Sequence, residues 1–195
     1  MEEYGPRKFV VLALNGYDNI NTIRTYQNMY PDVLMLRDPN WGVYQLYRQN
    51  GYIPLNYVLT QELIVDYFME GFSEGIIRNH IENLLAPVTV VLSYDGSPVP
   101  QGGTLSFDVT LTNWENTEQT FYALTEVTLP GGTTVILLGP VEITLDANQE
   151  VTVPLQHNIP LAAPLGMYEY TGMLGTFPPP EVMDYSSFEF EVVAP

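Results

Sequence analysis

The sequence predicts two domains of different class, an α/β domain over residues 1–86 followed by an antiparallel β-sandwich over residues 87–195. Three observations support this division. The first half alternates short apolar runs with segments of helical period, whereas the second half alternates apolar and polar residues. Pro87 stands where the period changes, and a helix cannot continue through it. We therefore expect the domain boundary within residues 85–88, with enough chain on each side to bury a core.

The first half predicts the element order strand, helix, strand, helix, strand, strand, helix. Residues 9–14 form a continuous apolar run that ends at Asn15-Gly16, which is typical of a parallel strand buried on both faces. Asp18 or Asn19 can cap the helix that follows. The remaining expected strands are residues 33–36, 55–60 and 63–69, and the remaining helices lie near residues 43–47 and 74–85.

Pro54 opens the third strand, because a proline cannot donate a backbone hydrogen bond inside a sheet. Only Gln61-Glu62 separates this strand from the next, so the two are expected to form an antiparallel hairpin. The last helix carries an apolar stripe with charged residues outside it.

The second half predicts strands throughout and no helix. Leu105, Phe107, Val109 and Leu111 alternate with polar residues, and the same pattern returns at residues 151–155 and 188–192. Glycine- and asparagine-containing turns separate about seven strands, the number expected of an immunoglobulin-like sandwich.

In residues 9–85 the order of elements, together with Val33 to Asp38, Tyr44 to Tyr47 and Ile53-Pro54, resembles the second half of the thioredoxin-like superfamily. The similarity is to its peroxiredoxin and thiol-disulfide oxidoreductase members. Residues 159–168 are similar to a loop in accessory sandwich modules of secreted bacterial proteins. The resemblance to the thioredoxin-like superfamily implies a cis Ile53-Pro54 bond at the family's cis-proline position. It also implies an extracellular or periplasmic location, although no signal peptide stands in this chain.

In that family a strand-helix unit with redox cysteines precedes the segment that this chain resembles, and only eight residues precede Phe9 here. The chain contains no cysteine, so it is expected to be redox-inert, without catalytic residues, cofactors or metal ligands. One alternative is the C-terminal fragment of an oxidoreductase or peroxiredoxin-like enzyme whose cysteine-bearing segment is absent. A second is a serine hydrolase, because Gly71 to Gly75 matches G-x-S-x-G around Ser73. The simpler reading of Ser73 is a helix N-cap.

Other polar residues give weaker signals. His80 lies on the apolar stripe of the last helix and is expected to be a packing residue, and His157 is too distant to complete a zinc site. Acidic turns at Asp95 and at residues 146–148 offer calcium as an alternative, without the spacing of a known calcium loop. A carbohydrate or peptide groove is a further alternative, floored by Phe121, Tyr122, Tyr168, Tyr170 and Tyr185.

The formal charge of −17 is unevenly spread, because all six basic residues precede Pro87. An acidic surface repels phosphate, so nucleic acid and anionic membranes are disfavoured as partners. No apolar run approaches the length of a membrane span.

We expect a structural or protein-interaction role. Under the resemblance, a missing central strand leaves the edges of residues 9–14 and 55–60 unpaired. Charged residues and prolines protect edge strands from pairing, and residues 9–14 have neither. We therefore expect a dimer formed through this edge.

Overall fold

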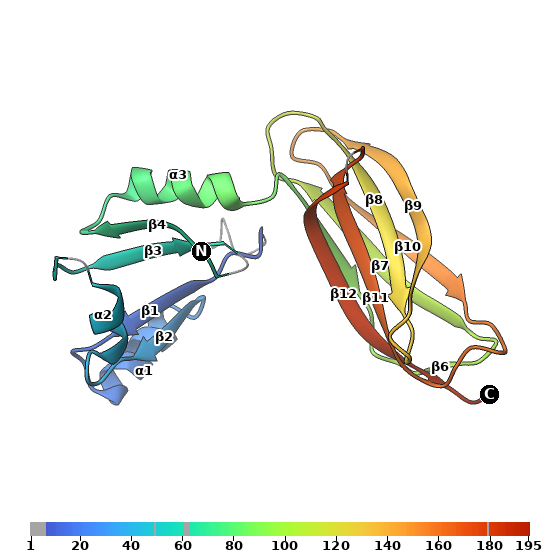
Figure 1. The fold of residues 1–195 in the computed structure, drawn as a ribbon, viewed down its shortest axis with the longest axis horizontal. Helices are drawn as coiled ribbons and strands as arrows, with labels where there is room; N and C mark the ends of the chain where they lie inside the picture. Colours follow the sequence, from blue (N-terminus) through green and yellow to red (C-terminus); the bar gives the residue numbers. More distant parts are fainter. Residues whose placement is uncertain (1–6, 49, 61–62, 179) are drawn as a thin grey trace. The chain divides into compact units, whose positions relative to one another are not determined.

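The computed structural model describes residues 7–48, 50–60, 63–178 and 180–195. The chain divides into two compact units, Met1–Leu85 (unit 1) and Ala86–Pro195 (unit 2), so the division falls one residue before the expected 86/87 boundary (Figure 1). Most of the regular structure is β-strand, and no helix in the described ranges is long and apolar enough to cross a bilayer.

Unit 1 has the order of elements that the sequence predicts. Its strands and helices are β1 (Val11–Asn15), α1 (Ile20–Met29), β2 (Val33–Arg37), α2 (Gly42–Tyr47), β3 (Leu55–Leu59), β4 (Val65–Glu70) and α3 (Glu74–Leu84). These strands form two separate sheets, parallel β1–β2 and antiparallel β3–β4. The predicted turn residues Gln61 and Glu62 lie outside the described residues. Because each sheet has only two described strands, β1 and β3 each have one edge without a described partner strand.

Short polar side chains fix the helix starts of unit 1. The Asn19 side chain accepts hydrogen bonds from the backbone N–H groups of Asn21 and Thr22, which confirms it as the cap of α1. At α2, buried Asp38 accepts from the backbone N–H groups of Val43 and Tyr44. Both parallel strands thus lead into loops that anchor the next helix.

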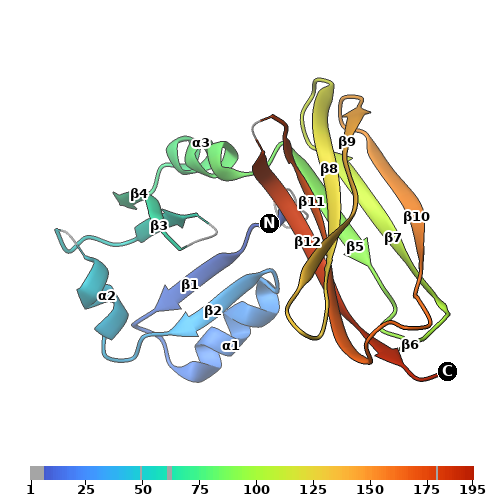
Figure 2. The same cartoon turned by 45° about the vertical axis from the view of Figure 1, so that its right-hand side comes forward.

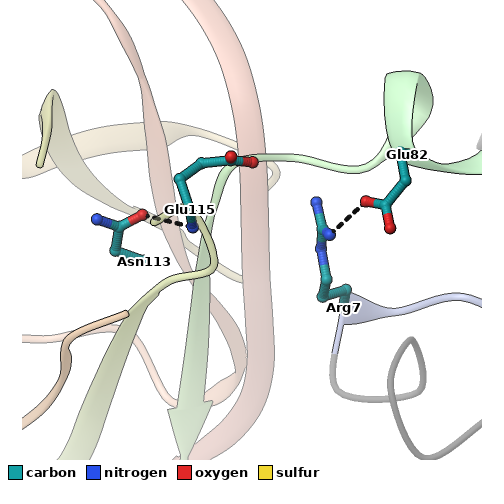
Figure 3. A network of polar contacts seen from close by, with 4 residues as sticks. All are labelled: Arg7, Glu82, Asn113 and Glu115. Atoms are coloured by element: carbon teal, nitrogen blue, oxygen red, sulfur yellow. Dashed lines mark hydrogen bonds and ion pairs between the residues drawn. The ribbon is translucent and has the colours of Figure 1, made fainter. Parts of the chain in front are cut away.

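An ion pair joins the segment before β1 to the last helix of unit 1. Arg7 Nη1 donates to Glu82 Oε2 at 2.8 Å, and the arginine side chain is only 9% exposed (Figure 3). Because the arginine side chain is buried, although Glu82 is 39% exposed, the pair restrains this segment more than a fully exposed pair would.

Unit 2 is a β-sandwich of two sheets (Figures 1 and 2). The three-stranded sheet has the order β10-β7-β5 and the five-stranded sheet has the order β6-β12-β11-β8-β9. The strands are β5 (Val88–Ser93), β6 (Val99–Pro100), β7 (Thr104–Asn113), β8 (Gln119–Thr128), β9 (Thr134–Leu145), β10 (Glu150–Asn158), β11 (Gly166–Thr176) and β12 (Glu181–Val193). The described strands of this unit number one more than predicted, since β6 is only two residues long.

The core of unit 2 follows the predicted alternation. Leu105, Phe107 and Leu111 are buried, and the polar residues between them face outward. From the other sheet Tyr170 and Phe190 complete an aromatic centre, where the Phe107 and Tyr170 rings lie 4.7 Å apart. The core therefore forms between the two sheets, as period-two strands require.

Side chains of β12 satisfy the outer edge of β5. Asp184 Oδ2 accepts from the backbone N–H of Val90 at 2.8 Å, and Ser186 Oγ accepts from that of Leu92 at 3.1 Å. Asp184 is only 4% exposed. A strand of one sheet is thereby hydrogen-bonded to side chains of the other, which closes this side of the sandwich.

Buried Asn113 organises the C-terminal end of β7. Its Nδ2 donates to the carbonyl oxygens of Thr117, Leu145 and Asp146, while its Oδ1 accepts from the backbone N–H of Glu115 (Figure 3). One amide thus ties the β7–β8 connection to the end of β9.

We expect Asp184→Ala to lower the free energy of unfolding of unit 2 by about 1–3 kcal/mol, because the Val90 N–H is left buried without its acceptor. Glu189→Ala is the matched control, since Glu189 is an exposed carboxylate on the same strand. Urea unfolding followed by circular dichroism checks both. Equal stability of the two variants would contradict the assigned role of Asp184.

Candidate interaction surface

One face of the β1–β2 sheet is apolar and uncovered. Leu12 lies opposite Leu34 and Leu14 opposite Leu36 in the parallel register, so all four side chains share a face. Each is 40–51% exposed. We call these four residues the leucine face.

The opposite face of the same sheet is covered by α1, which packs along β2 (Figure 2). Ile23 of α1 is 4% exposed, and Val11 and Val33 beneath it are half-buried. The prediction that the first strand is buried on both faces is therefore wrong, because a single helix covers only one side of this sheet. The β1–β2 sheet is thus covered by α1 on one face, and the leucine face is its exposed side.

The free edge of β1 borders this face. Asn15 accepts a backbone hydrogen bond from Asp38, so its carbonyl points toward β2. Backbone groups alternate in direction along a strand, which turns the N–H and C=O groups of Leu12 and Leu14 toward the unpaired edge. The same two residues thus offer apolar side chains and backbone groups that no described strand pairs.

The Ile53–Pro54 bond is cis, as is the Gly139–Pro140 bond. A shallow pocket of about 570 Å³ lies beside it, lined by Asn50, Tyr52, Ile53, Tyr67, Phe68, Met69, Glu70 and Gly71. The Glu70 carboxylate accepts from the backbone N–H groups of Asn50 and Gly51. The Glu70 carboxylate is thus engaged by the loop that contains Asn50 and Gly51, and the side chains that line the pocket are mainly apolar.

Ser73 and His80 do not form a catalytic pair. Ser73 occupies the N-cap position of α3 without a side-chain capping bond. His80 is seven residues further on, about 10 Å along the helix axis. Rather than simply packing, His80 is half-buried, is hydrogen-bonded through Nδ1 to Asp66 at 3.0 Å and stacks on Tyr67. The arrangement gives the serine no base, so the hydrolase alternative has no geometric support.

His157 belongs to the core edge of unit 2. Its Nε2 and Tyr170 Oη are hydrogen-bonded at 2.9 Å, and Tyr170 is fully buried. Burial lowers the pKa of His157 below its ordinary 6.5 and raises the pKa of Tyr170. Both groups are therefore neutral at pH 7 and act structurally. No group of histidine and carboxylate side chains suited to a metal is present among the described residues.

The remaining sequence candidates are structural as well. Asp95 accepts from the backbone N–H of Ser97, and Gln149 accepts through its side chain from the backbone N–H of Asp146, so both acidic segments stabilise turns. The proposed aromatic groove is wrong, because its members separate. Phe121, Tyr168 and Tyr170 are buried in the core, whereas Tyr122 and Tyr185 are not.

No protein-family model and no curated protein match the sequence. Solved structures match over a little more than half of the chain. The alkylpurine DNA glycosylase AlkC of Pseudomonas fluorescens, bound to DNA, is 14% identical with a TM-score of 0.45, over 56% of this chain and 31% of that one. A CARDB domain from Pyrococcus furiosus, in complex with di-metal ions, is 12% identical with a TM-score of 0.41, over 55% and 92%.

A third match is the sporulation control protein Spo0M of Bacillus subtilis, 12% identical with a TM-score of 0.43, over 57% of this chain and 51% of that one. The matched part thus spans under a third of the glycosylase and about half of Spo0M. These similarities are remote and assign no activity.

The resemblance to the thioredoxin-like superfamily is wrong. The matching structures are glycosylase, CARDB, β-glucosidase and sporulation-protein domains, and none of these is thioredoxin-like. The geometry of unit 1 agrees, because β1–β2 and β3–β4 form two small sheets and not parts of one. The family's cis-proline site at Ile53 and Pro54 and its absent cysteine-bearing segment lose their basis with it.

The stability of unit 2 is expected to fall as the pH drops below about 6.5, where the unfolded chain protonates His157 and the folded chain does not. The contribution is fully present above that pH. Carboxylates also titrate in this range, so the quantity to measure is the difference in unfolding temperature between the parent protein and His157→Gln, from pH 7.5 to 5. A constant difference over this range would contradict the burial of His157.

Proposed function

We propose that this chain is a non-catalytic interaction protein that associates with a second copy through unit 1. The observation that carries the proposal is the leucine face beside the unpaired edge of β1. Together they provide both elements that a strand-to-strand interface uses, free backbone groups and an apolar surface.

The energy of such an interface comes from backbone hydrogen bonds along the β1 edge and from cross-strand contacts of Leu12 and Leu14. A backbone hydrogen bond contributes about 0.5–1.5 kcal/mol net, and an apolar cross-strand pair contributes about 0.2–1 kcal/mol. Leu34 and Leu36 lie on β2, so they are not covered by edge pairing. The sum offsets part of the loss of translational freedom.

The geometry allows two copies to use the same surface. Two β1 edges can pair in antiparallel fashion around a two-fold axis, so that Leu12 and Leu14 of each copy face their counterparts. The pairing joins two β1–β2 sheets into one and needs no other segment.

Charge selects unit 1 as the associating part. It contains ten acidic and six basic residues, whereas unit 2 contains thirteen acidic residues and no Lys or Arg. Contact between two copies of unit 2 brings the larger like charges together, whereas contact through unit 1 does not. The acidic unit 2 then keeps the assembly soluble.

The chemistry of the chain supports a role other than catalysis. It has no cysteine for thiol exchange, and His80, the nearest histidine to Ser73 in the sequence, is hydrogen-bonded to Asp66. We further infer that unit 2 is an immunoglobulin-like module, which its two sheets support, since all their strand pairs except β6–β12 are antiparallel. The extracellular or periplasmic location stays a prediction.

We expect the protein to sediment as a dimer at micromolar concentration. The double variant Leu12→Lys/Leu14→Lys should weaken the dimer at least about tenfold, which is about 1.4 kcal/mol, because it charges the leucine face. Sedimentation velocity over a concentration series measures the change.

Leu46→Lys is the control, since Leu46 of α2 is 81% exposed and lies outside the leucine face. It should leave the dimer intact. A parent protein that stays monomeric at all concentrations, or a double variant that dimerises as before, would refute the proposal.

A further inference from the structure

The first half of β9 is an exposed apolar edge. Residues 134–138, here called the β9 edge segment, have the sequence Thr-Val-Ile-Leu-Leu, and their four apolar side chains are 39–59% exposed. We infer that this segment is a docking edge for an extended, basic strand of a partner protein. The site lies in unit 2 and is independent of the dimer interface proposed for unit 1.

The β9 edge segment is apolar on both faces of its sheet. Val135 lies opposite Val127, which packs against the core, so Val135 is on the core side but is 44% exposed. Ile136 lies opposite Glu126 and is 59% exposed. β9 has β8 as its one neighbour in the described sheet, which leaves its outer edge unpaired. A strand added there would extend the sheet and cover side chains on both faces.

Every other described edge of unit 2 is protected. β12 seals β5 through Asp184 and Ser186. β6 is only two residues long and contains Pro100. β10 contains Pro154. The Gln149 carbonyl accepts from the Asn113 N–H and so points toward β7, and backbone direction alternates along a strand. Pro154 therefore faces the free edge of β10, where its missing N–H prevents pairing. Short strands and prolines are the ordinary devices that prevent edge pairing.

The second half of β9 has the same protection, and the β9 edge segment does not. Gly139, with φ of +95°, ends the segment, and a side chain there would overlap the carbonyl oxygen of Ala123. Pro140 and Glu142 follow within the strand. The segment itself has neither charge nor proline, so pairing remains available over five residues.

The charge of unit 2 specifies the partner. It has thirteen acidic residues and no Lys or Arg, and Glu126 lies on the strand beside the segment. A strand with Lys or Arg beside its apolar residues is attracted, whereas a second copy of unit 2 brings the same negative charge. A basic partner strand is therefore favoured over self-pairing.

The test uses the full chain in the Leu12→Lys/Leu14→Lys background, so that association through unit 1 does not interfere. The probe is a fluorescent peptide of alternating threonine and valine with two lysines at each end. Matched peptides have glutamates at the ends, or a proline at the centre. The lysine peptide should bind at least about tenfold more tightly than either, and the advantage over the glutamate peptide should shrink in high salt.

Hydrogen exchange locates the binding. The lysine peptide should slow amide exchange in residues 134–138, and Ile136→Lys should abolish this effect. Val182→Lys is the control, since Val182 is 58% exposed and lies on β12. Equal binding of all three peptides, no slowing at residues 134–138, or a dimer that Ile136→Lys dissociates would each overturn the inference. The last result would identify a second copy as the occupant.

Discussion

An edge strand has backbone N–H and C=O groups that must be paired, covered or kept from partners, and this constraint governs both units. In unit 2, Asp184 and Ser186 of β12 take up the amides of β5, so two sheets close without a shared strand. The aromatic core can then form between them. Among the described residues of unit 1 no side chain seals β1 in this way, and the two small sheets remain separate. The proposed interaction role of unit 1 rests on the open edge of β1, which differs from the sealed edge of β5.

Charge and apolar exposure separate the two units in the same way. Unit 1 combines all six basic residues with the leucine face, so it can approach a copy of itself. Unit 2 has thirteen acidic residues and no basic one, and its β9 edge segment is suited to a positively charged strand. On these distributions we propose an assembly with a self-associating part and an acidic, partner-binding part. It requires no catalytic group.

Much of the fold could be predicted from periodicity, because Leu105, Phe107 and Leu111 alternate as a strand does and Asn19 has the chemistry of a cap. The leucine face could not. A continuous apolar run such as residues 9–14 is typical of a strand covered on both sides, and only the positions of the helices show that one side is bare. The resemblance to a redox family was wrong because order of elements does not fix how strands pair. Asp184 was missed, since its partner Val90 is 94 residues away.

We propose that the free edge of β1 pairs with a second copy, and amide exchange at Leu12 and Leu14 reports on this pairing. Their N–H groups face the unpaired edge, so they exchange slowly only when a partner strand covers them. We expect slow exchange at high protein concentration and fast exchange on dilution. Fast exchange at every concentration, or slow exchange that does not change on dilution and so reports pairing within one chain, would contradict it.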